Sequence, residues 1–89
     1  MQIKVNVRQD HIDRGTPGLC QSCPVALAVN EALPQNYKLL GVGTYWIVIF
    51  NPAGKQIDIP APICVSNFID RLDNYGERGQ SFNFDLTLP

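Results

Sequence analysis

The 89 residues are 45% hydrophobic and carry 7 basic and 8 acidic side chains, for a formal net charge of −1. A chain this short forms one hydrophobic core, so we expect a single domain over residues 1–89. The nearly neutral charge provides no general field for phosphate backbones or anionic lipids, which argues against nucleic acid and membrane as partners. The longest apolar run, YWIVIF at 45–50, is far shorter than the roughly 20 residues that span a bilayer.

The first segment, QIKVNVR at 2–8, alternates apolar with polar side chains, which predicts a strand with one buried face. DHIDRG at 10–15 offers Asp10 as an N-cap and Gly15 as a left-handed C-cap, which predicts a helix of about one turn. The N-terminus lacks the apolar core of a signal peptide, so we expect a cytoplasmic protein. An odd number of cysteines in that reducing compartment predicts thiols or metal ligands, not disulfides.

A second helix is predicted over 24–33, after a loop rich in Pro and Gly. Ser22 or Cys23 can cap it, and Pro24 suits its first position because that residue needs no hydrogen-bonded N–H group. Pro34 ends it. Almost all of its side chains are apolar, so it should be the buried helix.

The rest of the chain predicts three strands, an amphipathic helix and a last strand. They lie at 38–42, 44–50, 55–59, 60–74 and 81–89, with the second and third strands joined as a hairpin by the NPAGK turn. Together the elements predict an α+β fold. We expect a mainly antiparallel sheet of four to five strands with two to three helices packed on one face.

The strand TYWIVIF at 44–50 is apolar on both faces, unlike the first and last strands. The few short helices of this chain cannot cover both faces of the sheet. We therefore expect the face formed by Trp46, Val48 and Phe50 to contact loop residues or another copy of the chain. The loops at 34–38 and 74–80 are the alternative cover.

Cys20-x-x-Cys23 has the spacing of a zinc-binding pair, and His11 and Cys64 could complete four ligands. There is no second paired motif, however, which favours ordinary thiols. A redox pair is the other alternative, because a helix N-terminus lowers the pKa of a thiol. A Gly/Pro loop before Cys20 and Pro24 after Cys23 depart from the redox arrangement.

The segment DRGTPGLCQS brings Arg14, Gly15, Gly18 and Ser22 ahead of a helix start, which is a candidate site for phosphate or another anion. It matches no phosphate-binding fingerprint, so a surface loop before a capped helix is the plainer interpretation. Arg78 is a possible second cation there or a solvated loop residue.

No residue set points to catalysis or to a cofactor. His11 is the only histidine, and no serine or cysteine stands in a nucleophile motif with a base. Asp70 and Asp73 lie three residues apart on the polar face of their helix, where acids usually serve solubility. We expect a protein that is not an enzyme.

HIDRG at 11–15, CQSCPVALAVNEAL at 20–33, FIDRLD at 68–73 and FNFDL at 82–86 resemble a group of small uncharacterised proteins carried by bacteriophages and bacterial genomes. The clearest part is the I-D-x-G and C-P-V-A-x-A core. The resemblance implies a phage or mobile-element context in the host cytoplasm, with a host protein as a possible partner, and no catalytic role.

Three functional hypotheses remain. The first is a small non-enzymatic interaction protein, acting by protein–protein contact or as a homodimer through Trp46, Val48 and Phe50. The second is a sequestering binder of a small anionic ligand or nucleotide. The third is a small domain held together by zinc.

Overall fold

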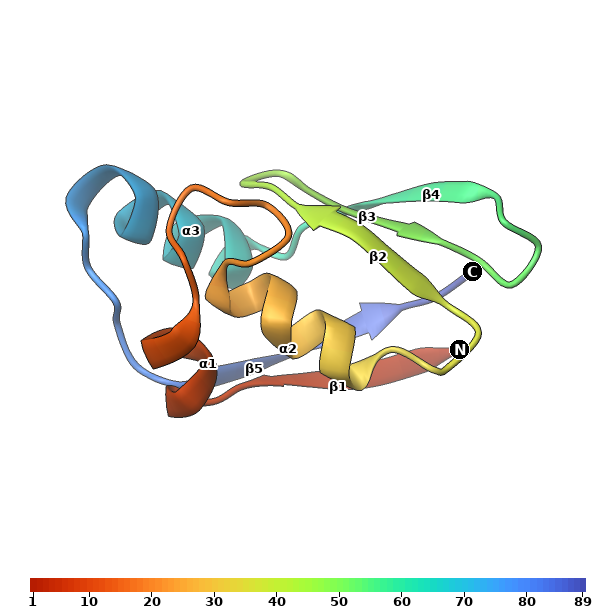
Figure 1. Ribbon diagram of the computed structural model, residues 1–89, viewed down its shortest axis with the longest axis horizontal. Helices are drawn as coiled ribbons and strands as arrows, with labels where there is room; N and C mark the ends of the chain where they lie inside the picture. The colour runs from red at the N-terminus through yellow and green to blue at the C-terminus, as the bar shows by residue number, and fades with distance from the viewer.

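The computed structural model describes residues 1–89 as three helices and five strands (Figure 1). In chain order these are β1 (Gln2–Val7), α1 (Gln9–Arg14), α2 (Pro24–Ala32), β2 (Lys38–Val42), β3 (Trp46–Phe50), β4 (Gln56–Pro60), α3 (Ile63–Tyr75) and β5 (Phe82–Thr87). The α+β class and the antiparallel pairing are confirmed. The strands are divided, however, between a two-stranded sheet, β1–β5, and a three-stranded sheet, β2–β3–β4.

The two ends of the chain form the first sheet. β1 pairs with β5 along its whole length, from Gln2 opposite Thr87 to Val7 opposite Phe82. The alternation of apolar and polar side chains in these strands places Val5 and Phe84 in the core, as their patterns predict. Helix α2 packs against β1.

In the second sheet β3 lies between β2 and β4. The β3–β4 hairpin turns at Pro52–Gly54, and its register runs from Trp46 opposite Pro60 to Phe50 opposite Gln56. The register between β2 and β3 shifts between Leu39 and Gly41. This irregularity is typical of a β-bulge and bends β2 where Gly41 pairs with Val48.

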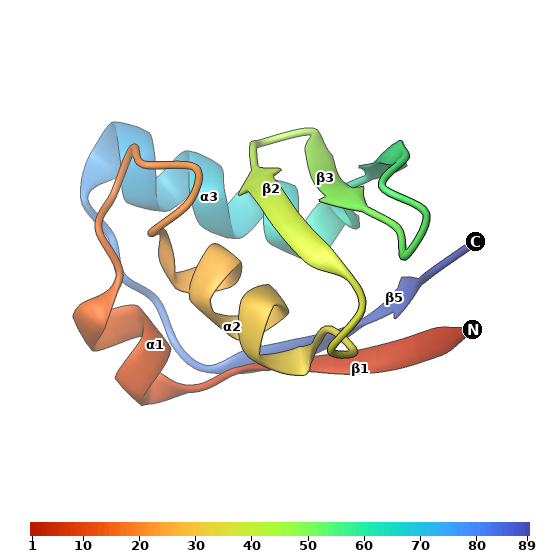
Figure 2. The same cartoon turned by 45° about the vertical axis from the view of Figure 1, so that its right-hand side comes forward.

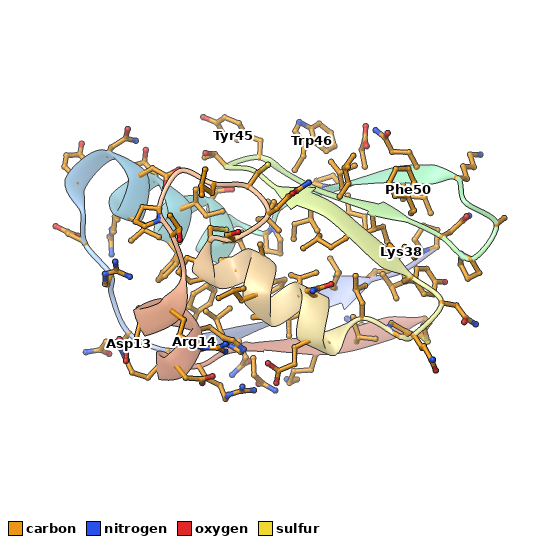
Figure 3. The ribbon with its side chains drawn as sticks, viewed as in Figure 1. Asp13, Arg14, Lys38, Tyr45, Trp46 and Phe50 are labelled. Carbon is orange, nitrogen blue, oxygen red and sulfur yellow. The ribbon has the colours of Figure 1, made fainter.

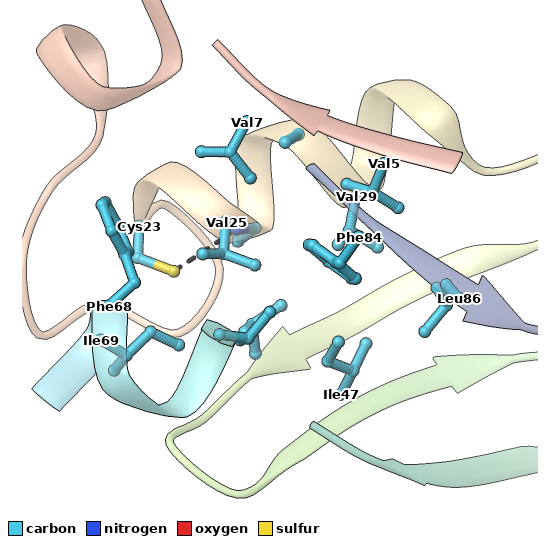
Figure 4. Packing of buried hydrophobic residues seen from close by; sticks show 14 of the residues in the cluster. Val5, Val7, Cys23, Val25, Val29, Ile47, Phe68, Ile69, Phe84 and Leu86 are labelled. Atoms are coloured by element: carbon cyan, nitrogen blue, oxygen red, sulfur yellow. Dashed lines mark hydrogen bonds between the residues drawn. The ribbon is translucent and has the colours of Figure 1, made fainter. Parts of the chain in front are cut away.

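Helix α2 occupies the centre of the molecule, as the two orientations in Figures 1 and 2 show. It contacts β1, α1 and β2, and therefore a strand of each sheet. Val25, Ala26 and Val29 are fully buried, which agrees with the nearly continuous apolar pattern of this helix. Figure 4 shows Val25 and Val29 among side chains of α3, β3 and β5.

Cys23 begins α2. It is the N-cap, and its Sγ accepts a hydrogen bond from the N–H group of Ala26 at 3.4 Å (Figure 4). Pro24 follows in the first turn, where it leaves no N–H group without a partner. Cys23 thus has the architectural role that the sequence favours for it.

Two details of α1 differ from the prediction. Arg8, not Asp10, is its N-cap, and the Asp10 carboxylate binds arginine side chains instead. Gly15 follows the helix in an extended conformation, with φ −67° and ψ 146°, and is not left-handed. A glycine is required at position 15 for a different reason, because a Cβ atom there would lie 2.4 Å from Cδ of Pro24.

Helix α3 buries Val65, Phe68, Ile69 and Leu72, the four positions that its periodicity predicts.

No helix in the structure has both the length and the apolar character needed to cross a membrane.

Candidate functional site

One side of the β2–β3–β4 sheet is only partly covered. On β3, Ile47 and Ile49 are fully buried, whereas Trp46 is 51% exposed and Val48 and Phe50 are half-buried. We call the surface that carries the latter three side chains the outer face. Trp46 keeps half of its surface in solvent, so this part of the outer face is accessible.

An apolar hollow of about 490 Å³ lies at the β2–β3 end of the outer face. Its lining consists of Cys20, Gln21, Leu40, Gly41, Val42, Gly43, Thr44, Tyr45, Trp46 and Val48. Its volume is within the range of about 300–1,000 Å³ that is usual for ligand pockets, although it is open to solvent. Tyr45 is 73% exposed, and Figure 3 shows Tyr45 and Trp46 projecting from the same margin of the molecule.

The loop before α2 forms one wall of this hollow because it is bonded to β2. The N–H group of Val42 donates to the Cys20 carbonyl at 2.8 Å, and Gln21 Nε2 donates to the Leu40 carbonyl at 3.1 Å. A Cβ atom on Gly41 would lie 3.1 Å from Cys20 Sγ, so a glycine allows the close approach of loop and strand.

Two charged residues flank the apolar stripe that Trp46, Val48 and Phe50 form on the outer face. Lys38 on β2 pairs with Phe50, and Asp58 on β4 pairs with Val48. Residues opposite each other in an antiparallel pair share a face of the sheet, so Lys38 and Asp58 lie on the outer face. Both are exposed, and neither takes part in an ion pair within the chain. Asp58 accepts only a hydrogen bond from Gln56 Nε2, at 3.1 Å.

The structure brings together no group of three or more His, Cys, Asp or Glu side chains that could hold a metal ion. Cys23 caps α2, Cys20 faces Gly41 and Cys64 is exposed in the first turn of α3. Burial raises the pKa of the Cys23 thiol, and the N–H groups near it offset this effect only in part. The lowered pKa on which a redox pair depends is therefore not found at Cys23.

The four residues proposed for an anion site do not line one hollow. Gly18 and Ser22 line a shallow one, whereas Arg14 and Gly15 line none of the five in the structure. The Arg14 guanidinium binds the Asp10 carboxylate at 3.1 Å, and the N–H group of Gly18 donates to Asp73 Oδ1 at 3.0 Å. An anion at this loop would therefore have to displace the Asp73 carboxylate from the Gly18 N–H group. It would also have to separate Arg14 from the Asp10 carboxylate.

A network of charged side chains joins α1 to the end of α2. Arg8 binds both Asp10, at 2.9 Å, and Glu31, at 2.7 Å, while Asp10 also binds Arg14. His11 Nε2 lies 2.8 Å from Glu31 Oε2. Hydrogen bonds from Arg8 are the largest cause that lowers the pKa of Asp10 and of Glu31 to about 2.

His11 is 1% exposed, and both of its ring nitrogens are occupied. Nδ1 accepts the backbone N–H group of Arg8 at 3.0 Å, so the ring proton lies on Nε2 and is directed at Glu31. Neither nitrogen is free to bind a metal or a substrate in this arrangement. No signal in the sequence pointed to the contact between His11 and Glu31, because the two residues lie 20 positions apart.

Arg78 binds the protein, not a ligand. Its Nη1 donates to the carbonyl groups of Ile12, at 2.6 Å, and of Gly15, at 3.3 Å. The loop between α3 and β5 is thereby held against the end of α1, where unpaired carbonyl groups favour a cation.

Comparison with known protein families, curated proteins and solved structures finds no match. The function therefore has to be inferred from the side chains themselves and from their surroundings.

Proposed function

We propose that this protein is a small binding protein, not an enzyme, and that it contacts a partner protein through the outer face of the β2–β3–β4 sheet. The observation that carries the proposal is the exposed pair Tyr45 and Trp46 beside an apolar hollow. An aromatic centre with a polar surround is the usual anatomy of a protein–protein interface.

Three features support this choice. Trp and Tyr contribute strongly to binding energy because they bury a large area with few rotatable bonds. Polar side chains at the margin, Lys38, Asp58 and Gln21, can orient a partner. The buried inner residues of β3, Ile47 and Ile49, hold the stripe on a rigid strand instead of a loop.

Photo-crosslinking in cells that naturally produce the protein tests the proposal. Tyr45→p-benzoylphenylalanine places the reactive group at the hollow, and the matched variant Asp13→p-benzoylphenylalanine places it on α1, away from this face (Figure 3). We expect adducts of defined mass from position 45 only. The further change Val48→Lys should abolish them, because it puts a charge in the centre of the face.

Mass spectrometry of the adducts identifies the protein that is bound. Equal labelling from both positions, or adducts that survive Val48→Lys, would contradict the proposed face. The absence of any protein adduct at position 45 would contradict the proposed function itself.

A further inference from the structure

We infer that the partner at the outer face is a second copy of this chain, packed face to face about a twofold axis. The inference rests on the proposed function, which requires only that some protein binds there. Its own basis is the self-complementary placement of Lys38 and Asp58 on either side of the stripe Trp46, Val48 and Phe50.

The pairing follows from the order of strands in the sheet. β3 is central, β2 carries the positive charge and β4 the negative charge. A twofold axis parallel to β3, midway between two stacked sheets, places β3 on its own copy and β2 over the β4 of the partner. The apolar stripe then packs against itself.

The same operation brings the charges together. Lys38 is level with Phe50 and Asp58 with Val48, a difference of two residues or about 6.6 Å along the strand. The flexible side chain of Lys38 can cover that distance to Asp58 of the partner subunit. Symmetry repeats the contact, so two charges that are unpaired in one chain form two ion pairs in the dimer.

The area available indicates a reversible dimer. Three strands of five residues form a face of about 14 by 16 Å, taking about 4.8 Å between strands and about 3.3 Å per residue. The area of this face is smaller than the roughly 800 Å² that each partner buries in a standard stable interface, although Tyr45 and Leu40 extend the face. The dimer should therefore dissociate on dilution.

Sedimentation equilibrium over a concentration series tests the dimer. We expect the apparent mass to rise from 9.9 kDa toward twice that value. Trp46 is the only tryptophan, so its fluorescence emission should shift to shorter wavelengths over the same range as it leaves water. A single 9.9 kDa species with unchanged emission overturns the inference.

Charge reversal tests the twofold arrangement. Lys38→Asp and Asp58→Lys, made separately, should each weaken the dimer about tenfold, since two attractive contacts become repulsive. The double variant should return to within about threefold of the wild type, which also shows that the changes leave the fold intact. Lys55→Asp is the matched control; it carries the same charge change, lies in the turn before β4 and should have little effect.

The outcomes separate this inference from the proposed function. Single reversals without effect, or a double variant as weak as either single one, overturn the twofold pairing. If the wild type is a monomer but position 45 cross-links to a different protein, the second copy is wrong and the proposed function stands. If position 45 gives no adduct and the chain is a monomer, both fail.

Discussion

Gly15 and Pro24 touch where the chain passes from α1 to α2. A side chain at Gly15 would overlap the proline ring, because its Cβ atom would lie 2.4 Å from Pro24 Cδ. Both residues are buried, so neither can move away without disturbing the core. This contact accounts for the glycine at position 15 without any ligand.

We expect Gly15→Ala to lower the free energy of unfolding by about 1–3 kcal/mol, the usual cost of overpacking. Urea unfolding followed by circular dichroism measures it. The control is Gly43→Ala, where the nearest atom is 3.8 Å from the new Cβ and the change should stay within about 0.5 kcal/mol. Equal effects at the two glycines would contradict the steric explanation.

At the scale of elements, the loop between α3 and β5 depends on few contacts. Residues 76–81 are exposed, and Arg78 is the side chain that ties this loop to the carbonyl groups at the end of α1. Helix α1 has only six residues and needs such tertiary contacts to remain folded.

We expect Arg78→Ala to reduce the free energy of unfolding by about 1 kcal/mol through loss of these hydrogen bonds. Amide exchange at Gly15 should become faster as α1 frays, which hydrogen exchange followed by NMR measures. Glu77→Ala removes a neighbouring side chain that makes no hydrogen bond or ion pair and serves as the control. Unchanged exchange at Gly15 would show that Arg78 does not hold α1.

At the scale of the whole molecule, the network around Arg8 links the end of β1, α1 and α2. The pKa values of Asp10 and Glu31 are about 2 in the folded chain, below their usual values of 3.8 and 4.5. Because their pKa values are lowered in the folded chain, these carboxylates stabilise the folded state at every pH above their usual pKa values. This stabilisation is lost as the pH falls toward 2.

We therefore expect the thermal unfolding midpoint, measured by circular dichroism at low salt, to be steady above about pH 5 and to fall between about pH 4.5 and 2. The double variant Asp10→Asn, Glu31→Gln should show a shallower fall because it lacks the two titrating groups. A variant that follows the wild-type curve would assign the acid sensitivity to other carboxylates.

The sequence predicted the elements well because their signals are local. The alternation in β1 and β5, the apolar α2 with its Cys23 and Pro24 start, and the spacing of Val65 to Leu72 in α3 need no knowledge of distant contacts. It also predicted the two apolar faces of β3. The prediction of a left-handed Gly15 was wrong, because the proximity of this residue to Pro24 depends on the path of the whole loop.

By itself, then, the sequence determined the class of fold, the boundaries of its elements to within three residues and the existence of a second apolar face on β3. Only the tertiary structure decided that the strands form two sheets and that Lys38 and Asp58 flank one stripe. It also decided two contacts between distant residues: Glu31 binds His11 and Arg8, and Asp73 accepts a hydrogen bond from the Gly18 N–H group. The physical reason is that periodicity and capping act within a few residues, whereas pairing between distant residues depends on how the elements pack.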